Sequence, residues 1–176
     1  MHRLRKRHSS RPDPNTPPVD AGLLLREQSL QGAAVAGGVA VLLTIALWVA
    51  LALVFDRYFP WFSVVQGFVV GRAIQRYGRG LHWSYPVLAG AFTCVAAFAG
   101  SFIVALFLTS REFYTPVLTL VGEISLHTIR VFVLQNFQTV EIIYMLFAAT
   151  LAAFYSGRRL SREEAVALRR LREQQT

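Results

Sequence analysis

The chain has 176 residues and a formal net charge of +8, with 54% hydrophobic residues and only 16% charged ones. A soluble domain usually has about 25% charged residues, so this composition excludes an ordinary soluble globular protein. Lys and Arg stand in short blocks between long apolar runs, which is typical of membrane proteins and not of nucleic-acid-binding domains. Its one cysteine, Cys94, excludes an internal disulfide framework and a cysteine-rich metal site.

The first twenty residues are basic and rich in proline. No apolar core and no small-residue cleavage site follow the basic stretch directly, so it does not have the pattern of a signal peptide. We expect residues 1–20 to form a disordered cytoplasmic tail, which either contacts anionic lipid head groups or serves only to set the topology. A juxtamembrane helix is expected over residues 21–32.

Four apolar segments predict membrane spans. The first, residues 33–55, is uncharged and would form about 34 Å of helix, enough to cross a hydrocarbon core of about 30 Å. The second, residues 61–78, is shorter and has two arginines in its last two turns, where long side chains can reach the head groups. The third covers residues 86–108 and the fourth residues 140–157. The fold class predicted is an all-α integral membrane four-helix bundle.

The distribution of positive charge predicts the orientation. Fifteen of the eighteen Lys and Arg residues lie before the first span, in the hairpin from Arg72 to Arg79 that begins at the end of the second span, or after the fourth span. An excess of Lys and Arg marks the cytoplasmic side, so both termini are expected to be cytoplasmic, in the inner membrane of a bacterium. The arginines predicted to bind anionic lipid at this side are Arg72, Arg76, Arg79, Arg158 and Arg159.

The stretch "GFVVGRAIQRYGRG" resembles a glycine-rich phosphate loop only superficially. A P-loop needs a Lys and then a Ser or Thr after its glycines, and this stretch has neither. Gly67 and Gly71 are instead four residues apart in an apolar helix, a spacing that lets a second helix approach closely. The spacing therefore indicates helix packing, either within the chain or between copies of it.

Small residues recur at the same spacing on the other spans. They include Ala36, Ala40 and Thr44 on the first, and Ala149 and Ala153 on the fourth. The residues predicted to make the packing contacts of the second and third spans are Gly67, Gly71, Ala89, Thr93, Ala97 and Ser101.

More than thirty residues separate the third and fourth spans, whereas helix connections in bundles usually have about 2–8. Over residues 116–137 a helical period places Thr119, Glu123, His127 and Arg130 on one polar stripe. A pair of strands is the alternative. A fifth span would put three ionisable residues in the bilayer and the basic C-terminus outside. We therefore expect an outer-face amphipathic helix, interfacial or re-entrant, between spans 3 and 4.

Ionisable residues near a membrane are candidates for function. Glu123, His127 and Arg130, with Glu141 at the outer end of the fourth span, are the candidates for partner or lipid contact. Glu123 and His127 could form an intrahelical pair, share a proton or supply two metal ligands. A zinc site needs three or four ligands, and no second histidine is close in sequence. No catalytic residue, metal ion or cofactor is predicted.

The C-terminal residues 158–176 predict a basic amphipathic helix on the cytoplasmic side. Ser161 and Glu164 have the spacing of a capping box at its start. Such a helix could dock on a cytosolic partner, lie on anionic lipid or remain solvated.

The order of features over residues 33–108 resembles a group of small four-span bacterial inner-membrane proteins with no assigned activity. The resemblance depends on a first span ending "ALWVALALVF", the short second span "GFVVGRAIQRYGRG" and a third span containing "LAGAFTCVAAFAGSF". It implies a bacterial cytoplasmic membrane and brings no substrate, cofactor or catalytic residue.

The sequence as a whole predicts a non-enzymatic accessory or scaffolding subunit of a bacterial membrane complex. Its partners would be lipids and either other integral membrane proteins or further copies of itself. One alternative is a small homo-oligomeric transporter or channel that uses Glu123, His127 and Arg130. Against it, no span has a charge in its middle, where selectivity residues usually lie. A lipid-modifying enzyme is the third possibility, and only Glu123, His127 and Glu141 could begin its active site.

Overall fold

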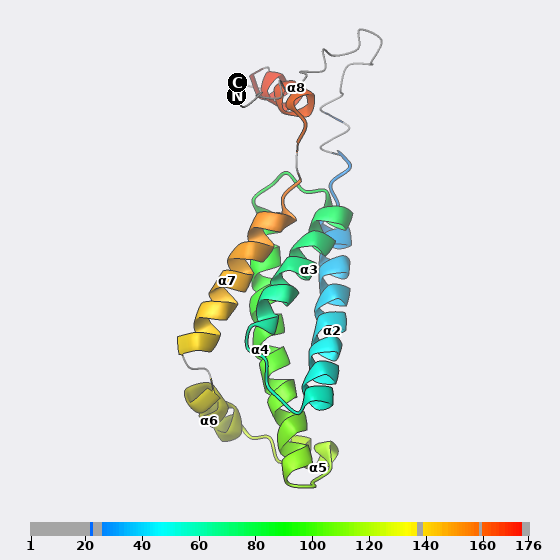
Figure 1. Cartoon of the computed structure of the whole chain (residues 1–176). Helices are drawn as coiled ribbons and strands as arrows, with labels where there is room; N and C mark the ends of the chain where they lie inside the picture. Colours follow the sequence, from blue (N-terminus) through cyan, green and yellow to red (C-terminus); the bar gives the residue numbers. More distant parts are fainter. Residues whose placement is uncertain (1–21, 23–25, 137–138, 159, 174–176) are drawn as a thin grey trace, which may run out of the picture. The chain divides into compact units, whose positions relative to one another are not determined.

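A computed structural model describes residues 22, 26–136, 139–158 and 160–173, and every regular element in these residues is an α-helix (Figure 1). The chain forms two compact units, residues 27–159 and the two chain ends together, residues 1–26 with 160–176. The first unit contains α2 (Leu30–Phe55), α3 (Phe62–Gly78), α4 (Ser84–Glu112), α5 (Val117–Gly122), α6 (Leu126–Asn136) and α7 (Thr139–Ser156). The second contains α8 (Arg162–Glu173).

Three helices are long and apolar enough to cross a membrane: α2 with 26 residues, α4 with 29 and α7 with 18. The prediction of an all-helical membrane protein is therefore confirmed at this level. These helices match the first, third and fourth spans expected from the sequence. The segment expected as the second span is α3, which has 17 residues and contains Arg72 and Arg76.

Four helices pack side by side in the first unit. α3 and α4 contact each other, and each of them also packs against both α2 and α7, so α2 and α7 lie on opposite sides of the α3–α4 pair (Figure 1). The faces turned away from the bundle expose large apolar side chains, among them Leu42 and Leu43 on α2 and Leu146 and Phe147 on α7. This is the polarity pattern of a bundle that has lipid as its solvent.

Two apolar clusters fill the bundle. One is dominated by small residues with Val70, Ile74 and Tyr85, and the other is built around Trp48 and Phe62. The Trp48 ring packs against Phe62 at a centroid distance of 5.5 Å and stacks on Tyr58 at 5.8 Å. The turn between α2 and α3 is thereby fixed to the bundle by aromatic contacts.

The helix ends explain where the chain turns. α2 begins after Ser29, whose hydroxyl oxygen accepts the Gly32 N–H at 2.9 Å, an ordinary N-cap. α2 and α3 both end at a residue in the left-handed region, Asp56 with φ of 50° and Arg79 with φ of 48°. In both cases the N–H of that residue returns to the carbonyl four residues earlier, which is the αL form of C-cap.

Helix α4 is longer at both ends than the span expected over residues 86–108. Pro86 lies in its first turn, where a missing N–H costs nothing because no partner exists there. At the other end the helix continues through polar residues to Glu112. It stops where Tyr114 adopts φ of 52° and the Ser110 hydroxyl donates to the Thr115 carbonyl at 2.6 Å.

The segment expected as one amphipathic helix over residues 116–137 is two helices, α5 and α6. Gly122 ends the first, and glycine is among the weakest helix formers. Ser125 begins the second: its hydroxyl accepts the Thr128 N–H at 3.2 Å, while the Thr128 hydroxyl accepts the Ser125 N–H at 3.3 Å. This reciprocal cap fixes a new helix start three residues after Gly122.

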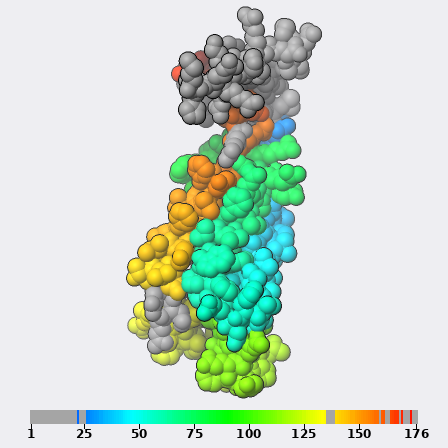
Figure 2. Space-filling model, viewed as in Figure 1, coloured from blue at the N-terminus to red at the C-terminus, as the bar shows by residue number. Residues whose placement is uncertain are grey.

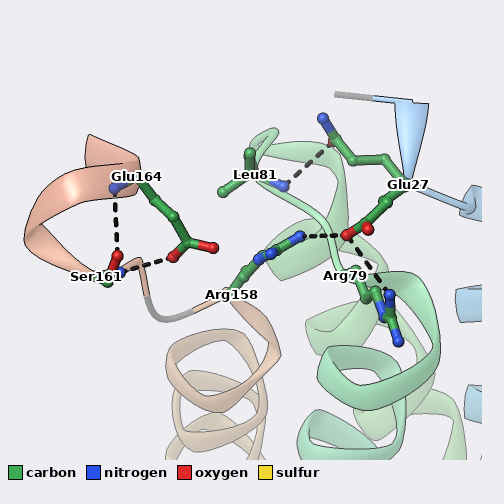
Figure 3. A network of polar contacts seen from close by, with 7 residues as sticks. Glu27, Arg79, Leu81, Arg158, Ser161 and Glu164 are labelled. Atoms are coloured by element: carbon green, nitrogen blue, oxygen red, sulfur yellow. Dashed lines mark hydrogen bonds and ion pairs between the residues drawn. The ribbon is translucent and has the colours of Figure 1, made fainter. Parts of the chain in front are cut away.

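In the second unit, the expected capping box at the start of α8 is confirmed. The Ser161 hydroxyl accepts the Glu164 N–H at 3.2 Å, and the Glu164 carboxylate accepts the Ser161 N–H at 2.7 Å (Figure 3). The tail expected over residues 1–20 lies outside the described residues, as do residues 21 and 23–25 of the juxtamembrane segment 21–32. The last part of that segment, from Leu30, is the first turn of α2.

Candidate functional site

The closest helix contact in the first unit joins α3 to α7. A Cβ atom added at Gly71 would lie 2.7 Å from the Ala152 carbonyl oxygen and 2.9 Å from the Ala152 Cα, and one added at Gly67 would overlap the Ala148 carbonyl in the same way. The backbones of the two helices therefore touch at these glycines. Figure 2 shows α3 and α7 side by side along this face of the molecule.

The small residues predicted for helix packing on α4 face the interior. Ala89 and Thr93 are completely buried, and Ala97 and Ser101 are nearly so. The Thr93 hydroxyl is satisfied by the Ala89 carbonyl at 2.8 Å. Ser101 accepts a hydrogen bond from another part of the chain, described below.

The buried face of α7 differs from the expectation by one residue. Ala149 and Ala153 are half-buried, while their neighbours Ala148 and Ala152 are completely buried and meet α3. On α2, Ala40 and Thr44 are buried as expected, whereas Ala36 is half-buried.

A completely buried polar group lies in the centre of the bundle. The Gln66 side chain on α3 donates to the Thr44 hydroxyl on α2 at 3.4 Å. Among the described residues, the side-chain oxygen of Gln66 and the Trp48 indole N–H have no hydrogen-bond partner. Gly100 on α4 makes room for the Trp48 ring, because a Cβ at this position would lie 2.8 Å from that ring. The sequence prediction did not single out Gln66, although it is one of only two polar residues, with Ser63, in the first eleven of its span.

A basic end of the bundle is organised by one carboxylate. Glu27 forms ion pairs with Arg79, 3.5 Å away, and with Arg158, 3.1 Å away (Figure 3). The residue after Glu27 also forms a hydrogen bond to the α3–α4 loop, because the Gln28 side chain accepts the Leu81 N–H at 3.2 Å. These contacts tie the start of α2, the end of α3 and the end of α7 to one another.

The other arginines predicted as lipid anchors lie at this same end. Arg72 donates to the Gln75 side chain at 2.8 Å, and Gln75 donates to the Gly157 carbonyl at 2.6 Å. Arg76 is exposed. A groove of about 500 Å³ is lined by Arg76 and Arg79 together with Gln75, Tyr77 and Arg158. Arg159 lies outside the described residues.

The opposite end of the bundle contains a cavity of about 250 Å³, here called the Glu141 cavity. Its walls come from the α2–α3 turn, α4, α6 and α7, and it is lined by Tyr58, Ser101, Ala105, Leu108, Thr109, Glu112, Phe132 and Glu141. Sequence positions more than eighty residues apart meet here.

Tyr58 and Glu141 give this cavity its chemistry. The Tyr58 hydroxyl donates to the Ser101 hydroxyl at 2.8 Å, so the two groups fix each other across the cavity wall. Burial raises the pKa of Tyr58, the hydrogen bond to Ser101 lowers it, and the nearby Glu141 carboxylate raises it. Glu141 lies in the first turn of α7, and its buried Oε2 atom has no hydrogen-bond partner among the described residues.

A second cavity of about 320 Å³ adjoins the first and shares three of its lining residues, Ala105, Thr109 and Phe132. Its remaining walls are mainly apolar and come from α4, α5 and α6, with Glu123 and Thr128 as the polar groups. Phe132 holds α6 against α4 through an edge-to-face contact with Phe102, at a centroid distance of 4.9 Å.

The polar stripe expected from Glu123 to Arg130 is divided by the break between α5 and α6. Glu123 caps the end of α5 and lines the second cavity, whereas His127 and Arg130 belong to α6; all three are exposed. Of the four candidates from this region, Glu141 alone lines the Glu141 cavity. In the part of the chain that the structure describes, no three His, Cys, Asp or Glu side chains group closely enough to share a metal ion.

Three members of the site were not anticipated: Tyr58, Thr109 and Glu112. Tyr58 belongs to the "DRYFP" turn, which the sequence marks only as interfacial, and the other two lie beyond the predicted end of the third span. Comparison of the chain with protein-family models, with curated proteins and with solved structures finds no match.

Proposed function

We propose that this protein is a non-enzymatic accessory or scaffolding subunit of a complex in a bacterial cytoplasmic membrane. In this proposal α3 is a fourth membrane span and both termini are cytoplasmic. The partners are other integral membrane proteins, which the chain contacts through the segment α5–α6. The observation that supports it best is the exposed apolar surface of this segment.

The exposed surface lies on helices that contribute little to the bundle. Leu118 on α5 and Leu126 on α6 are each 85% exposed, and Leu134 on α6 is 71% exposed. Unlike the lipid-facing sides of α2 and α7, this surface also displays polar residues, His127 and Arg130 among them. Apolar anchors surrounded by polar groups are the usual composition of a protein-binding surface.

Two features support four spans. α3 would be about 26 Å long at 1.5 Å per residue, slightly short for a bilayer, but Arg72 and Arg76 in its last turns can extend to the head groups. With four spans, the basic end lies on one side together with both termini, which agrees with the positive-inside rule.

The experiment is extraction in mild detergent at native expression, followed by the mass and composition of the particle. A reproducible complex with other membrane proteins is expected. The double variant Leu118→Gln and Leu126→Gln should release the partners while the chain remains inserted, because it removes the two most exposed leucines of the segment.

Val166→Gln is the matched control, since Val166 is also an exposed apolar residue but belongs to α8 in the other unit. Loss of the complex in the control and not in the double variant would place the partner on the C-terminal helix and contradict the proposal. A homo-oligomer without other proteins would favour the transporter or channel alternative, with ion flux as the next assay.

A further inference from the structure

We propose that the Glu141 cavity binds a primary ammonium group carried on an apolar chain, with the ammonium on the Glu141 carboxylate and the chain along Phe132 into the adjoining cavity. The site shares helices α5 and α6 with the surface that we assign to protein partners, but its lining includes none of the exposed leucines of that surface, Leu118, Leu126 and Leu134.

The first argument is the unpaired oxygen of Glu141. A buried acceptor without a donor costs free energy, because it has lost water and gained nothing in return. Glu141 Oε2 is such an acceptor, and it belongs to a residue that lines an open volume of about 250 Å³. Oε2 itself has almost no exposed surface, so a ligand that brings an N–H donor into this volume recovers the missing interaction once the Glu141 side chain turns Oε2 towards it.

The second argument is the charge of the lining. The described residues around the cavity include two carboxylates, Glu112 and Glu141, and no Lys, Arg or His. Two arginines are next in sequence to lining residues, Arg57 and Arg111, and neither of them lines the cavity. Arg57 is exposed, and Arg111 donates to the Leu53 carbonyl at 2.6 Å and lies 3.9 Å from Asp56. A cation is therefore the favoured ligand.

The third argument selects the kind of cation. A hard metal ion requires about six oxygen ligands, and the described residues hold no group of three acidic or metal-binding side chains. A quaternary ammonium has no N–H with which to reach Oε2. A primary ammonium has three donors, and the cavity offers the hydroxyl of Thr109 beside its carboxylates.

The fourth argument concerns the rest of the ligand. The shared wall of Ala105 and Phe132 leads from the Glu141 cavity to the second cavity, whose lining is mainly apolar. Together the two cavities reach the size of small-molecule sites, about 300–1,000 Å³. A ligand with an ammonium head and an alkyl tail fits this pair of adjoining cavities, the head in the polar Glu141 cavity and the tail in the mainly apolar second cavity.

The test uses the full chain in phosphatidylcholine nanodiscs, with octylamine as the probe and calorimetric titration as the readout. The wild-type protein should bind octylamine, and Glu141→Gln should weaken binding by about tenfold or more, the value of one charge-assisted hydrogen bond. Glu173→Gln is the control, because it removes an exposed carboxylate from α8 and should leave binding unchanged.

A second comparison needs no variant. Octyltrimethylammonium has the same charge and chain but no N–H, so the wild-type protein should bind it about tenfold more weakly than octylamine. Equal binding of the two probes, or equal binding by wild type and Glu141→Gln, would overturn the proposal.

Phosphatidylethanolamine distinguishes the two natural sources of a primary ammonium. If adding this lipid to the nanodiscs lowers the apparent affinity for octylamine, the site takes a lipid head group. If the affinity does not change, the ligand is a free amphiphilic amine. Either result is compatible with the site; absence of octylamine binding is not.

Discussion

At the scale of single residues, the contact of Gly67 and Gly71 with α7 is the tightest constraint in the bundle. Both glycines lie in regular helix and neither has a positive φ, so their conformational freedom is not what the fold uses. What matters is the absence of a side chain, which lets the α3 backbone reach the carbonyls of Ala148 and Ala152. Dispersion contacts at this distance substitute for the hydrophobic driving force that lipid does not provide.

This contact predicts opposite outcomes for two glycine substitutions. Gly71→Leu forces α3 and α7 apart and should destabilise the bundle by about 1–3 kcal/mol or more, the usual cost of overpacking. Gly38→Ala on α2 has no atom within 4 Å of the added Cβ and should be neutral or slightly stabilising. The measurement is unfolding in mixed micelles with increasing denaturing detergent. Equal stability of Gly71→Leu and wild type would show that the helices are not in contact there.

The register of α7 illustrates a limit of sequence reasoning at this scale. The helix contains two alanine pairs, Ala148–Ala149 and Ala152–Ala153, and either member of each pair gives the same small-residue spacing. In a soluble helix the polar face would decide between them. Here lipid and bundle interior are both apolar, so the sequence contains no contrast that selects Ala148 and Ala152.

At the scale of elements, the positions of the long apolar helices follow directly from the sequence, because a bilayer imposes a minimum length and excludes charge. The full length of α4 does not, since this helix continues past the predicted span at both ends. The structure of the segment between α4 and α7 was harder to predict. Its helical period continues across Gly122, and only the local cap formed by Ser125 and Thr128 shows that the chain starts a new helix. A helical period in the sequence indicates which face of a helix is apolar, but it does not indicate where one helix ends and the next begins.

The cap predicts a local effect. Ser125→Ala removes the side-chain acceptor of the Thr128 N–H and should destabilise α6 by about 0.5–2 kcal/mol. Amide hydrogen exchange should then increase in α6 and not in α8. Ser161→Ala removes the corresponding cap from α8 and should give the reverse pattern. If Ser125→Ala leaves exchange in α6 unchanged, the α5–α6 break does not depend on this cap.

At the scale of the whole molecule, the two ends of the bundle differ in chemistry. One end gathers Glu27, Arg79 and Arg158 in ion pairs, and the other contains the Glu141 cavity. The basic end could be anticipated, since its arginines form blocks in the sequence. The cavity could not, because Tyr58, Ser101 and Glu141 become neighbours only through the way the helices pack.

The proposed topology predicts which positions face each side of the membrane. In a Cys94→Ala background, single cysteines at Arg57 and Tyr114 should react with an impermeant maleimide on intact cells, whereas those at Trp83 and Ser161 should react only after permeabilisation. All four positions are exposed. Arg57 and Trp83 flank α3, so labelling of both from the same side would show that α3 does not cross the membrane.

The arrangement of the helices also bears on the order in which the protein assembles. α2, α3 and α4 contact one another and are synthesised first, while α7, which covers the glycines of α3, is the last helix of the bundle to leave the ribosome. During that interval, in the proposed topology with α3 as a span, Gly67 and Gly71 are uncovered and can accept any helix with small residues four apart. The partly synthesised chain is therefore the form most susceptible to pairing with a helix of another protein. Prompt packing of α7 onto α3 prevents this pairing, because α7 covers both glycines.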